Sequence, residues 1–451
     1  MKMSSSAGFS VLAAGAMLSA GSAAHAVPSF ARQTGLACTT CHLSWPELTT
    51  VGRQFKLGAY TLMRPDVTAR AWVPTTANTP APVLPLAAMM QVSATHTRSA
   101  NGADLAQQNT AVLQDLSVFY AGRISRRSGA FAQWTYDGVA HHSAIDNVDL
   151  RVADQRQWAG VDLRYGLTVN NNPTVSDIYN TTPAWRFPFA SSGVAVAPNA
   201  AAILDGGLAQ QVAGLGVYTL WNQTLYAELA TYRTADRMLS VFRAGTDKTT
   251  AAALQGNAPY WRIALQHVWD AGVQSAMLGA YGMEARKFPD NTQPKGATDR
   301  FQDSGIDAQY QYITDRHRFS AQFSWLNEKQ HYDASFQTGT SNVSDTLRGF
   351  NGKLSYYYQS KYGATIGYFR TSGNVDSILY NTGAALTGSI DGSPKTRGYI
   401  LEADWLPLRN IRLLLQYTAY QEFNGRRSNY DGFGRNAADN NSLYAVAWLM
   451  F

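Results

Sequence analysis

The stretch Phe319-Ser320-Ala321-Gln322-Phe323-Ser324-Trp325 decides the fold, because apolar and polar residues alternate along it without a break. A period of two places the apolar side chains on one face of a β-strand and the hydroxyl and amide side chains on the other. Residues 399–405 and 411–419 follow the same pattern. Such alternation is typical of a strand in a membrane barrel, with its apolar face toward lipid and its polar face toward the lumen.

Sixteen segments of this kind follow one another from about residue 86 to the C-terminus. Their centres fall near residues 91, 117, 133, 150, 164, 214, 228, 265, 278, 308, 322, 355, 367, 401, 416 and 446. Short connections, such as Trp221-Asn222-Gln223, alternate with long ones, such as residues 171–205. Outer-membrane barrels have short periplasmic turns and long extracellular loops, so the first and last strands begin and end on the periplasmic side. We predict an all-β fold, a 16-stranded transmembrane β-barrel of the bacterial outer membrane.

The N-terminus predicts export. Lys2, an apolar stretch from about Phe9 to Leu18 and the small residues Ala24-His25-Ala26 are typical of a secretory signal peptide, so we expect the mature chain to begin at Val27. The apolar stretch is too short to span a bilayer, and no run of about 20 apolar residues follows it, so no transmembrane helix is expected. The predicted division is a signal peptide (1–26), a small α-helical segment (27–64), a proline-rich linker (65–85) and the barrel (86–451).

Composition agrees with a barrel. The 451 residues include 24 Tyr, 11 Trp and 18 Phe, with only 15% charged residues, which suits aromatic girdles around an apolar band. A soluble all-β protein could have the same composition, but the signal peptide and the terminal Phe451, which closes an alternating strand, favour the membrane barrel. The net charge is +6 without a clustered stripe of Lys and Arg, so no nucleic-acid partner is expected.

The motif Cys38-Thr39-Thr40-Cys41-His42 contains the only two cysteines of the chain. C-x-x-C-H is the attachment signature of a c-type haem, in which both thiols bind the haem vinyl groups and the histidine ligates the iron. A disulfide or half of a zinc site are the alternatives. Zinc needs about four ligands, and no further cysteine is present to supply them. We therefore predict one covalent haem c held by Cys38 and Cys41.

His42 is then the proximal iron ligand, and the sixth ligand is open. Methionine in that position gives a higher potential than histidine. We favour Met89 as the second iron ligand, followed by Met63 and Met90, with His96 as the remaining candidate. Fewer than 40 residues precede the linker, which is marginal for an autonomous core. We therefore expect the haem segment to plug the barrel lumen at its periplasmic mouth.

The segment from Val27 to His42, continuing through Pro46-Glu47-Leu48 and Gly52-Arg53-Gln54-Phe55-Lys56 to Tyr60, resembles the fused monohaem cytochrome–porins of the outer membrane. That family is best known from iron-oxidising bacteria. The resemblance implies a signal peptide, one N-terminal haem c and a 16-strand porin. It also implies electron flow from an extracellular donor such as Fe(II), through the haem, to a soluble periplasmic carrier.

Four further residues match the family motif, namely Phe30, Arg32, Phe55 and Lys56. We expect the two phenylalanines to pack on the haem and the two basic residues to pair with its propionates. The chain departs from the family at Leu36, where methionine is usual, and at Gly58-Ala59-Tyr60, which alters a Gly-Tyr pair.

The leading hypothesis is an outer-membrane electron conduit, a redox carrier rather than an enzyme that makes bonds. Its expected partners are outer-membrane lipid, a periplasmic carrier and an external donor. The alternatives are a diffusive porin with a structural or regulatory haem segment, and a haem enzyme with an open distal site. His141-His142 with Asp137, Asp146 and Asp149 is a candidate Fe(II)-docking cluster, although an ordinary polar loop explains the same residues.

Overall fold

The computed structural model describes residues 29–62, 84–99, 107–243 and 252–451. The expected signal peptide (1–26), the start of the mature chain at Val27 and nearly all of the expected linker (65–85) lie outside these residues. In the described part of the chain, no helix is long and apolar enough to cross a membrane.

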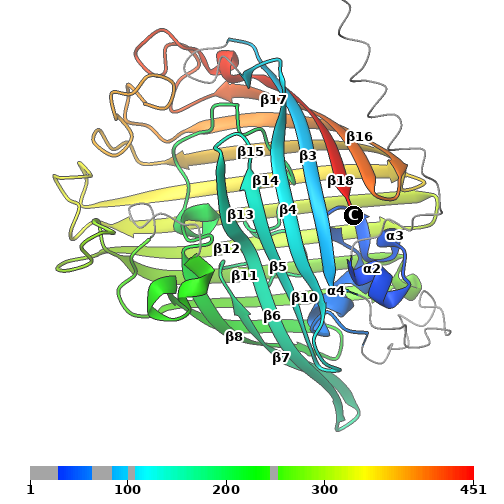
Figure 1. Ribbon diagram of the computed structural model, residues 1–451. Coiled ribbons are helices and arrows are strands. Elements are labelled where there is room, and N and C mark those ends of the chain that lie inside the picture. Colours follow the sequence, from blue (N-terminus) through cyan, green and yellow to red (C-terminus); the bar gives the residue numbers. More distant parts are fainter. Residues whose placement is uncertain (1–28, 63–83, 100–106, 244–251) are drawn as a thin grey trace, which may run out of the picture.

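Sixteen antiparallel strands form a closed barrel (Figure 1). Each strand pairs with the next along the chain, and the last pairs with the first to close the ring. The strands are β3 (Leu86–Thr97), β4 (Ala111–Arg123), β5 (Ser128–Asp137), β6 (His142–Trp158), β7 (Val161–Asn170), β8 (Val212–Trp221), β9 (Leu225–Thr234), β10 (Ala258–Trp269), β11 (Gln274–Lys287), β12 (Asp299–Ile313), β13 (His317–His331), β14 (Ser344–Tyr358), β15 (Tyr362–Gly373), β16 (Thr396–Leu408), β17 (Ile411–Glu422) and β18 (Ser442–Met450). Each of them contains one predicted centre, so the predicted barrel is confirmed.

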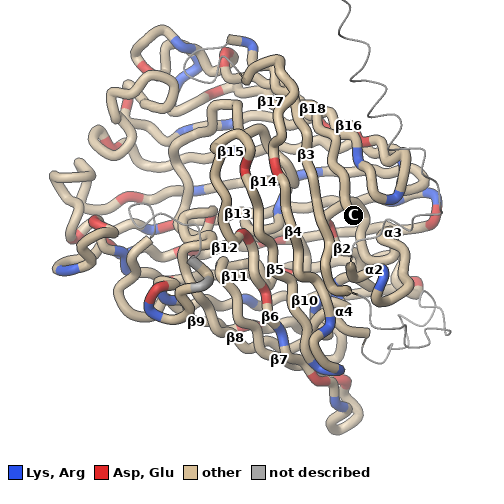
Figure 2. The backbone as a smooth tube through the Cα atoms, in the orientation of Figure 1, with Lys and Arg blue, Asp and Glu red and all other residues tan. Residues whose placement is uncertain are grey.

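The two faces of the wall differ in chemistry as the alternation predicted. On β16, Tyr399 and Leu401 are exposed on the outside, whereas Glu402 and Asp404 are buried in the lumen. Arg412 of β17 neutralises both carboxylates, at 2.8 Å from Glu402 and 2.6 Å from Asp404. Buried charges require such partners. Figure 2 shows charged residues both along the strands and in the loops.

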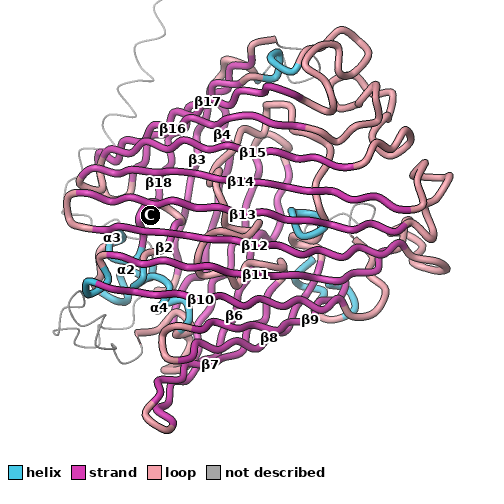
Figure 3. The backbone as a smooth tube through the Cα atoms, turned by 180° about the vertical axis from the view of Figure 1, so that it is seen from behind, coloured by secondary structure: helices cyan, strands magenta, loops and turns pink. Residues whose placement is uncertain are grey.

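Short hairpins join the strands at one end of the barrel and long loops at the other (Figure 3). Asn222 and Gln223 connect β8 to β9 with φ of 48° and 57°, and Gln359 and Ser360 connect β14 to β15 with φ of 52° and 54°. Two successive positive φ values are the geometry of a tight hairpin whose twist matches that of its strands. The long-loop end also holds short helical turns, namely η4 (Ala235–Arg237), η5 (Ser240–Arg243) and η7 (Ala437–Asn440), while η6 (Asp270–Gly272) lies in a short hairpin.

The N-terminal segment lies at the short-turn end, beside the C-terminus (Figure 1). It consists of three short helices and one small strand pair, in the order α2 (Ser29–Thr34), α3 (Cys38–Cys41), β1 (His42–Ser44), β2 (Glu47–Leu48) and α4 (Thr50–Leu57). Its polar groups bond to lumen-facing residues of β12, β13, β14 and β17, as described below. The segment therefore occupies the barrel mouth, as the plug hypothesis requires.

The long connection between β7 and β8 folds back into the lumen. Val175, Ile178 and Tyr179 of this connection are fully buried, and its single helical turn η3 (Ile203–Gly207) packs near β12. The connection meets the N-terminal segment inside the barrel, where the Leu48 amide donates to Asn180 Oδ1 over 2.9 Å. The sequence predicted a long loop here but gave no sign that it turns inward.

Candidate cofactor site at the barrel mouth

The two cysteines are separated by one helical turn. Cys38 and Cys41 begin and end α3, a spacing that places both side chains on the same side of the turn. Both are free thiols and half-buried. Burial raises the pKa of Cys38, and burial together with the neighbouring Cys38 raises the pKa of Cys41 to about 12. Both sulfurs are therefore protonated at neutral pH.

His42 follows directly in extended conformation, with φ of −122° and ψ of 137°. Its Nδ1 lies 3.2 Å from the carbonyl oxygen of Pro46. A carbonyl can only accept, so this contact assigns the proton to Nδ1 and leaves the Nε2 lone pair free. Burial lowers the pKa of His42, which favours the neutral imidazole. Metal-ligating histidines are oriented by hydrogen bonds of this kind from the other ring nitrogen.

Thr49 and Gly52 hold α4 against the Cys38–Cys41 turn. The Thr49 amide donates to the Cys41 carbonyl over 2.9 Å, and its hydroxyl donates to the Thr40 carbonyl over 2.6 Å. The same hydroxyl caps α4 by accepting from the Gly52 amide at 3.3 Å. A Cβ atom at Gly52 would overlap the Cys41 carbonyl oxygen. Only glycine permits this close approach of the helix to the cysteine backbone.

Three aromatic residues of the N-terminal segment pack together. Phe30 and Tyr60 stack with ring centroids 5.2 Å apart, and Phe55 meets Phe30 edge-on at 5.1 Å. The Tyr60 hydroxyl donates to Asp149 Oδ2 of β6 over 2.6 Å, which fixes the cluster to the barrel wall. Such a cluster is a suitable apolar surface for a flat hydrophobic group.

The two basic residues of the motif bond to protein carbonyls. Arg32 donates to the Leu86 carbonyl at the start of β3. Lys56 donates to the carbonyls of Val175 and Asp177 over 2.7 Å each, and its ammonium lies over the Trp185 ring. The structure thus gives Lys56 a role in holding the inward loop, rather than the expected pairing with a propionate. Burial, with the positive charge of Arg151 second, lowers the pKa of Lys56 to about 7.

A buried carboxylate anchors the β1–β2 pair to the wall. Glu47 forms an ion pair with Lys353 of β14 and accepts hydrogen bonds from Gln311 of β12 and from Gln322 of β13, over 3.1 and 3.2 Å. Both charged side chains of the pair are excluded from solvent. The segment is therefore fixed to three neighbouring strands through one residue.

Two arginines of the wall bond to the backbone of the motif and of the residues that follow it. Arg318 of β13 donates to the carbonyls of Thr39 and His42 over 2.8 and 3.1 Å. Arg412 of β17 donates to the Trp45 carbonyl over 2.8 Å. Sequence reasoning missed both, because these arginines are remote from the motif along the chain and no local pattern marks them.

The structure separates the candidates for the sixth ligand. Met89 faces the lumen, buried in a cluster with Trp448 against which Phe30 packs. Met90 and His96 follow the opposite parity on β3 and lie on its outer face. Met63 lies outside the described residues. Met89 is therefore the only one of the three described candidates on the same side of the wall as His42, and its role as a ligand stays a prediction.

The candidate Fe(II)-docking cluster is not assembled. Asp149 is fully buried and pairs with Arg151 at 2.8 Å, whereas Asp137 caps a turn by accepting from the Val139 and Ala140 amides. His141 contacts Tyr136 instead of a carboxylate. Within the described ranges, no group of three or more His, Cys, Asp or Glu residues could hold a metal ion.

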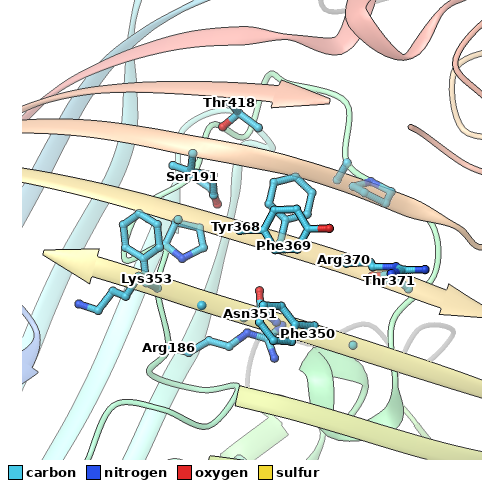
Figure 4. Close-up of a pocket in the computed structure, with 18 of the residues that line it drawn as sticks. Arg186, Ser191, Phe350, Asn351, Lys353, Tyr368, Phe369, Arg370, Thr371 and Thr418 are labelled. Atoms are coloured by element: carbon cyan, nitrogen blue, oxygen red, sulfur yellow. The ribbon is translucent and has the colours of Figure 1, made fainter. Parts of the chain in front are cut away.

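A cavity of about 320 Å³ lies on the inner side of β13–β17 against the inward loop (Figure 4). Its lining includes Arg186 and Ser191 of the loop, Asn351 and Lys353 of β14 and Thr418 of β17. Lys353 thus borders this cavity while it binds Glu47 of the plug.

The described chain forms a closed barrel of sixteen antiparallel strands, which is the fold of the smaller porins. No protein-family model and no curated protein matches the chain. Among solved structures, it is similar to OmpF of Salmonella typhi, at 11% identity over 81% of this chain and 97% of that one, with a TM-score of 0.41. It is also similar to the outer-membrane channel DcaP of Acinetobacter baumannii, at 11% identity over 81% and 96%, with a TM-score of 0.46.

Proposed function

We propose that the protein is an outer-membrane electron conduit with a single c-type haem. Electrons enter from an extracellular donor such as Fe(II) and leave to a soluble carrier in the periplasm. The observation that carries this proposal is the position of Cys38, Cys41 and His42 inside the mouth of the barrel, with the His42 ring oriented by the Pro46 carbonyl. The haem, when bound, supplies a one-electron Fe(III)/Fe(II) couple.

The donor set fits that group. Two protonated thiols on one helical turn suit covalent attachment, and a neutral imidazole with a free Nε2 suits an iron ligand. Phe30, Phe55 and Tyr60 of the same segment supply an aromatic cluster. Met89 is the inward-facing sulfur on the first strand and the proposed second ligand.

The wall keeps the site in place and limits water. Arg318 and Arg412 hold the backbone of the motif, while Glu47 ties the β1–β2 pair to Lys353. The inward loop covers the segment from the long-loop side through Asn180. A site enclosed in this way reaches the periplasm at the short-turn end and the outside only through the barrel interior.

The test uses outer membranes from cells that export the full chain. We expect the barrel band to stain for covalent haem, to show a low-spin c-type spectrum, and to be reduced by Fe(II) added to intact cells. The variant Cys38→Ser/Cys41→Ser should insert as a heat-modifiable barrel and lose the stain. An unstained wild-type band, or a stained band that no external donor reduces, would overturn the proposal.

The second candidate is a diffusive porin whose N-terminal segment is structural. The cavity beside β13–β17 favours it, since that space adjoins the long-loop end. Single-channel recordings separate the two candidates. A permanently wide conductance in the haem-loaded protein supports the porin, whereas a closed or very small one supports the conduit.

A further inference from the structure

The outer face of β14, β15 and β16 shows a graded order of side chains toward the long-loop end. On β15 the successive outward residues are Ile366, Tyr368 and Arg370. On β16 they are Leu401, Tyr399 and Arg397 in the same direction. Apolar, aromatic and cationic residues in this order match the hydrocarbon, interface and headgroup levels of a bilayer.

β14 repeats the aromatic and basic steps with Phe350 and Arg348. The aromatic residues form a continuous ladder, with ring centroids 5.8 Å apart for Phe350–Tyr368 and 5.2 Å for Tyr368–Tyr399. One arginine thus lies directly beyond each ring of the ladder, on the loop side.

The three arginines occupy neighbouring register positions on adjacent strands. Arg370 lies directly opposite Arg397 in the β15–β16 register. Arg370 is also opposite Phe350, so Arg348 is its diagonal neighbour on β14. Directly opposed side chains have Cβ atoms about 5 Å apart and diagonal ones about 7–8 Å, and like charges so placed repel one another. A bound anion would relieve this repulsion.

Few carboxylates in the described part of the chain neutralise the charges of these arginines. Arg397 pairs with Glu422 at 3.3 Å, and Arg348 donates to the neutral Asn327 over 3.2 Å. No described carboxylate forms an ion pair with Arg348 or Arg370, and both are exposed. Farther round the barrel, the outward residues Arg286 and Arg300 are again directly opposed, and Lys329 is diagonal to Arg300, with Glu284 beside them.

We propose that Arg348, Arg370 and Arg397 bind the phosphate groups of a phosphorylated glycolipid in the leaflet at the long-loop end. Arginine presents a planar fork that matches phosphate oxygens, and three such groups on adjacent strands can hold two phosphates at fixed depth. The rings of the aromatic ladder then lie against the glycolipid's upper acyl region. This proposal does not depend on the cofactor.

The test is lipid binding by the full-length protein in neutral detergent, measured by native mass spectrometry with lipid A as the probe. For Arg348→Gln/Arg370→Gln/Arg397→Gln we expect at least about a tenfold loss of affinity, because charge-assisted hydrogen bonds to phosphate are lost. The matched control is Arg126→Gln/Arg156→Gln/Arg316→Gln, which removes three exposed arginines from the short-turn end and should bind as wild type.

Three further measurements keep the result unambiguous. Heat-modifiability confirms that each variant is a folded barrel. Affinity of the wild type should fall as salt increases, since charge attraction is screened. The wild-type protein should bind dephosphorylated lipid A weakly. Its affinity should equal that of the triple variant for intact lipid A. Equal lipid A affinity of wild type and triple variant would overturn the proposal, as would full competition by equimolar inorganic phosphate, which would indicate a site for free anions.

Discussion

Gly52 is the residue at which α4 comes closest to the cofactor motif. In Gly52→Val the new side chain would overlap the Cys41 carbonyl and push the helix away from the Cys38–Cys41 turn. We expect a destabilisation of about 1–3 kcal/mol, typical of overpacking, and a clear loss of haem per barrel. Haem stain normalised to barrel protein, together with thermal melting, measures both effects.

The control is Gly349→Ala on the inner face of β14. Its Cβ would meet no atom within 4 Å, and its φ is not positive. This variant should keep the wild-type haem content and melting temperature. If Gly52→Val behaves in the same way, the contact between α4 and the motif has no consequence for the site.

Lys56 makes the stability of the packed N-terminal segment depend on pH. Its pKa of about 7 in the folded chain is below its ordinary value of 10.5. The unfolded chain therefore binds more protons between about pH 7 and 10.5, so stability rises with pH in this window and is lowest below pH 7. At about 1.4 kcal/mol per pKa unit, the difference amounts to a few kcal/mol.

In Lys56→Met this slope should disappear. Protease resistance of the N-terminal segment between pH 6 and 10 is the measurement, with Lys361→Met in an exposed short turn as the control that retains the slope. A slope of equal size in Lys56→Met would assign the pH dependence to another group.

At the residue scale, the candidate haem-binding residues could be predicted from the sequence. The arginines that hold their backbone in place could not. Cys38, Cys41 and His42 are recognisable because the chemistry needs them adjacent in the chain. Arg318 and Arg412 could not be foreseen, because they lie 276 and 367 residues from the carbonyls they hold, those of His42 and Trp45. Only the closure of the barrel brings them to the motif.

The β1–β2 pair forms a buried ion pair with the wall through Glu47 and Lys353. Glu47→Gln leaves the ammonium of Lys353 buried without its counter-charge, which costs about 3–5 kcal/mol. We expect the N-terminal segment to become accessible to protease while the barrel remains folded. Lys353→Met added to Glu47→Gln should recover part of the loss, since the unpaired charge is then gone.

The exposed pair Arg426–Asp391 in the long loops is the matched control. Asp391→Asn should change stability by about 1 kcal/mol or less, because solvent already screens that pair. A similar small effect of Glu47→Gln would mean that the segment is held mainly by its other contacts.

At the element scale, the alternation of apolar and polar residues was enough to locate the strands. Each strand is amphipathic by itself, so its pattern does not depend on its neighbours. The inward course of the β7–β8 connection could not be predicted in this way. Its buried residues, such as Val175 and Tyr179, have no regular period, and their contacts come from strands far along the chain.

The whole barrel should conduct little. The N-terminal segment and the inward loop meet within the lumen through Leu48 and Asn180, and Lys56 joins them again at Val175. Deletion of residues 27–64 should therefore raise the single-channel conductance in planar bilayers above that of the full chain. An unchanged conductance would show that the segment does not limit the passage.

The seam where β18 meets β3 has a consequence for biogenesis. Arg32 bonds to Leu86 on one side of that seam, and Trp45 packs on Trp448 on the other, with ring centroids 6.3 Å apart. The N-terminal segment thus touches both strands of this seam. We therefore expect the segment to stabilise the closed ring of strands, so that its removal slows the assembly of the heat-modifiable barrel.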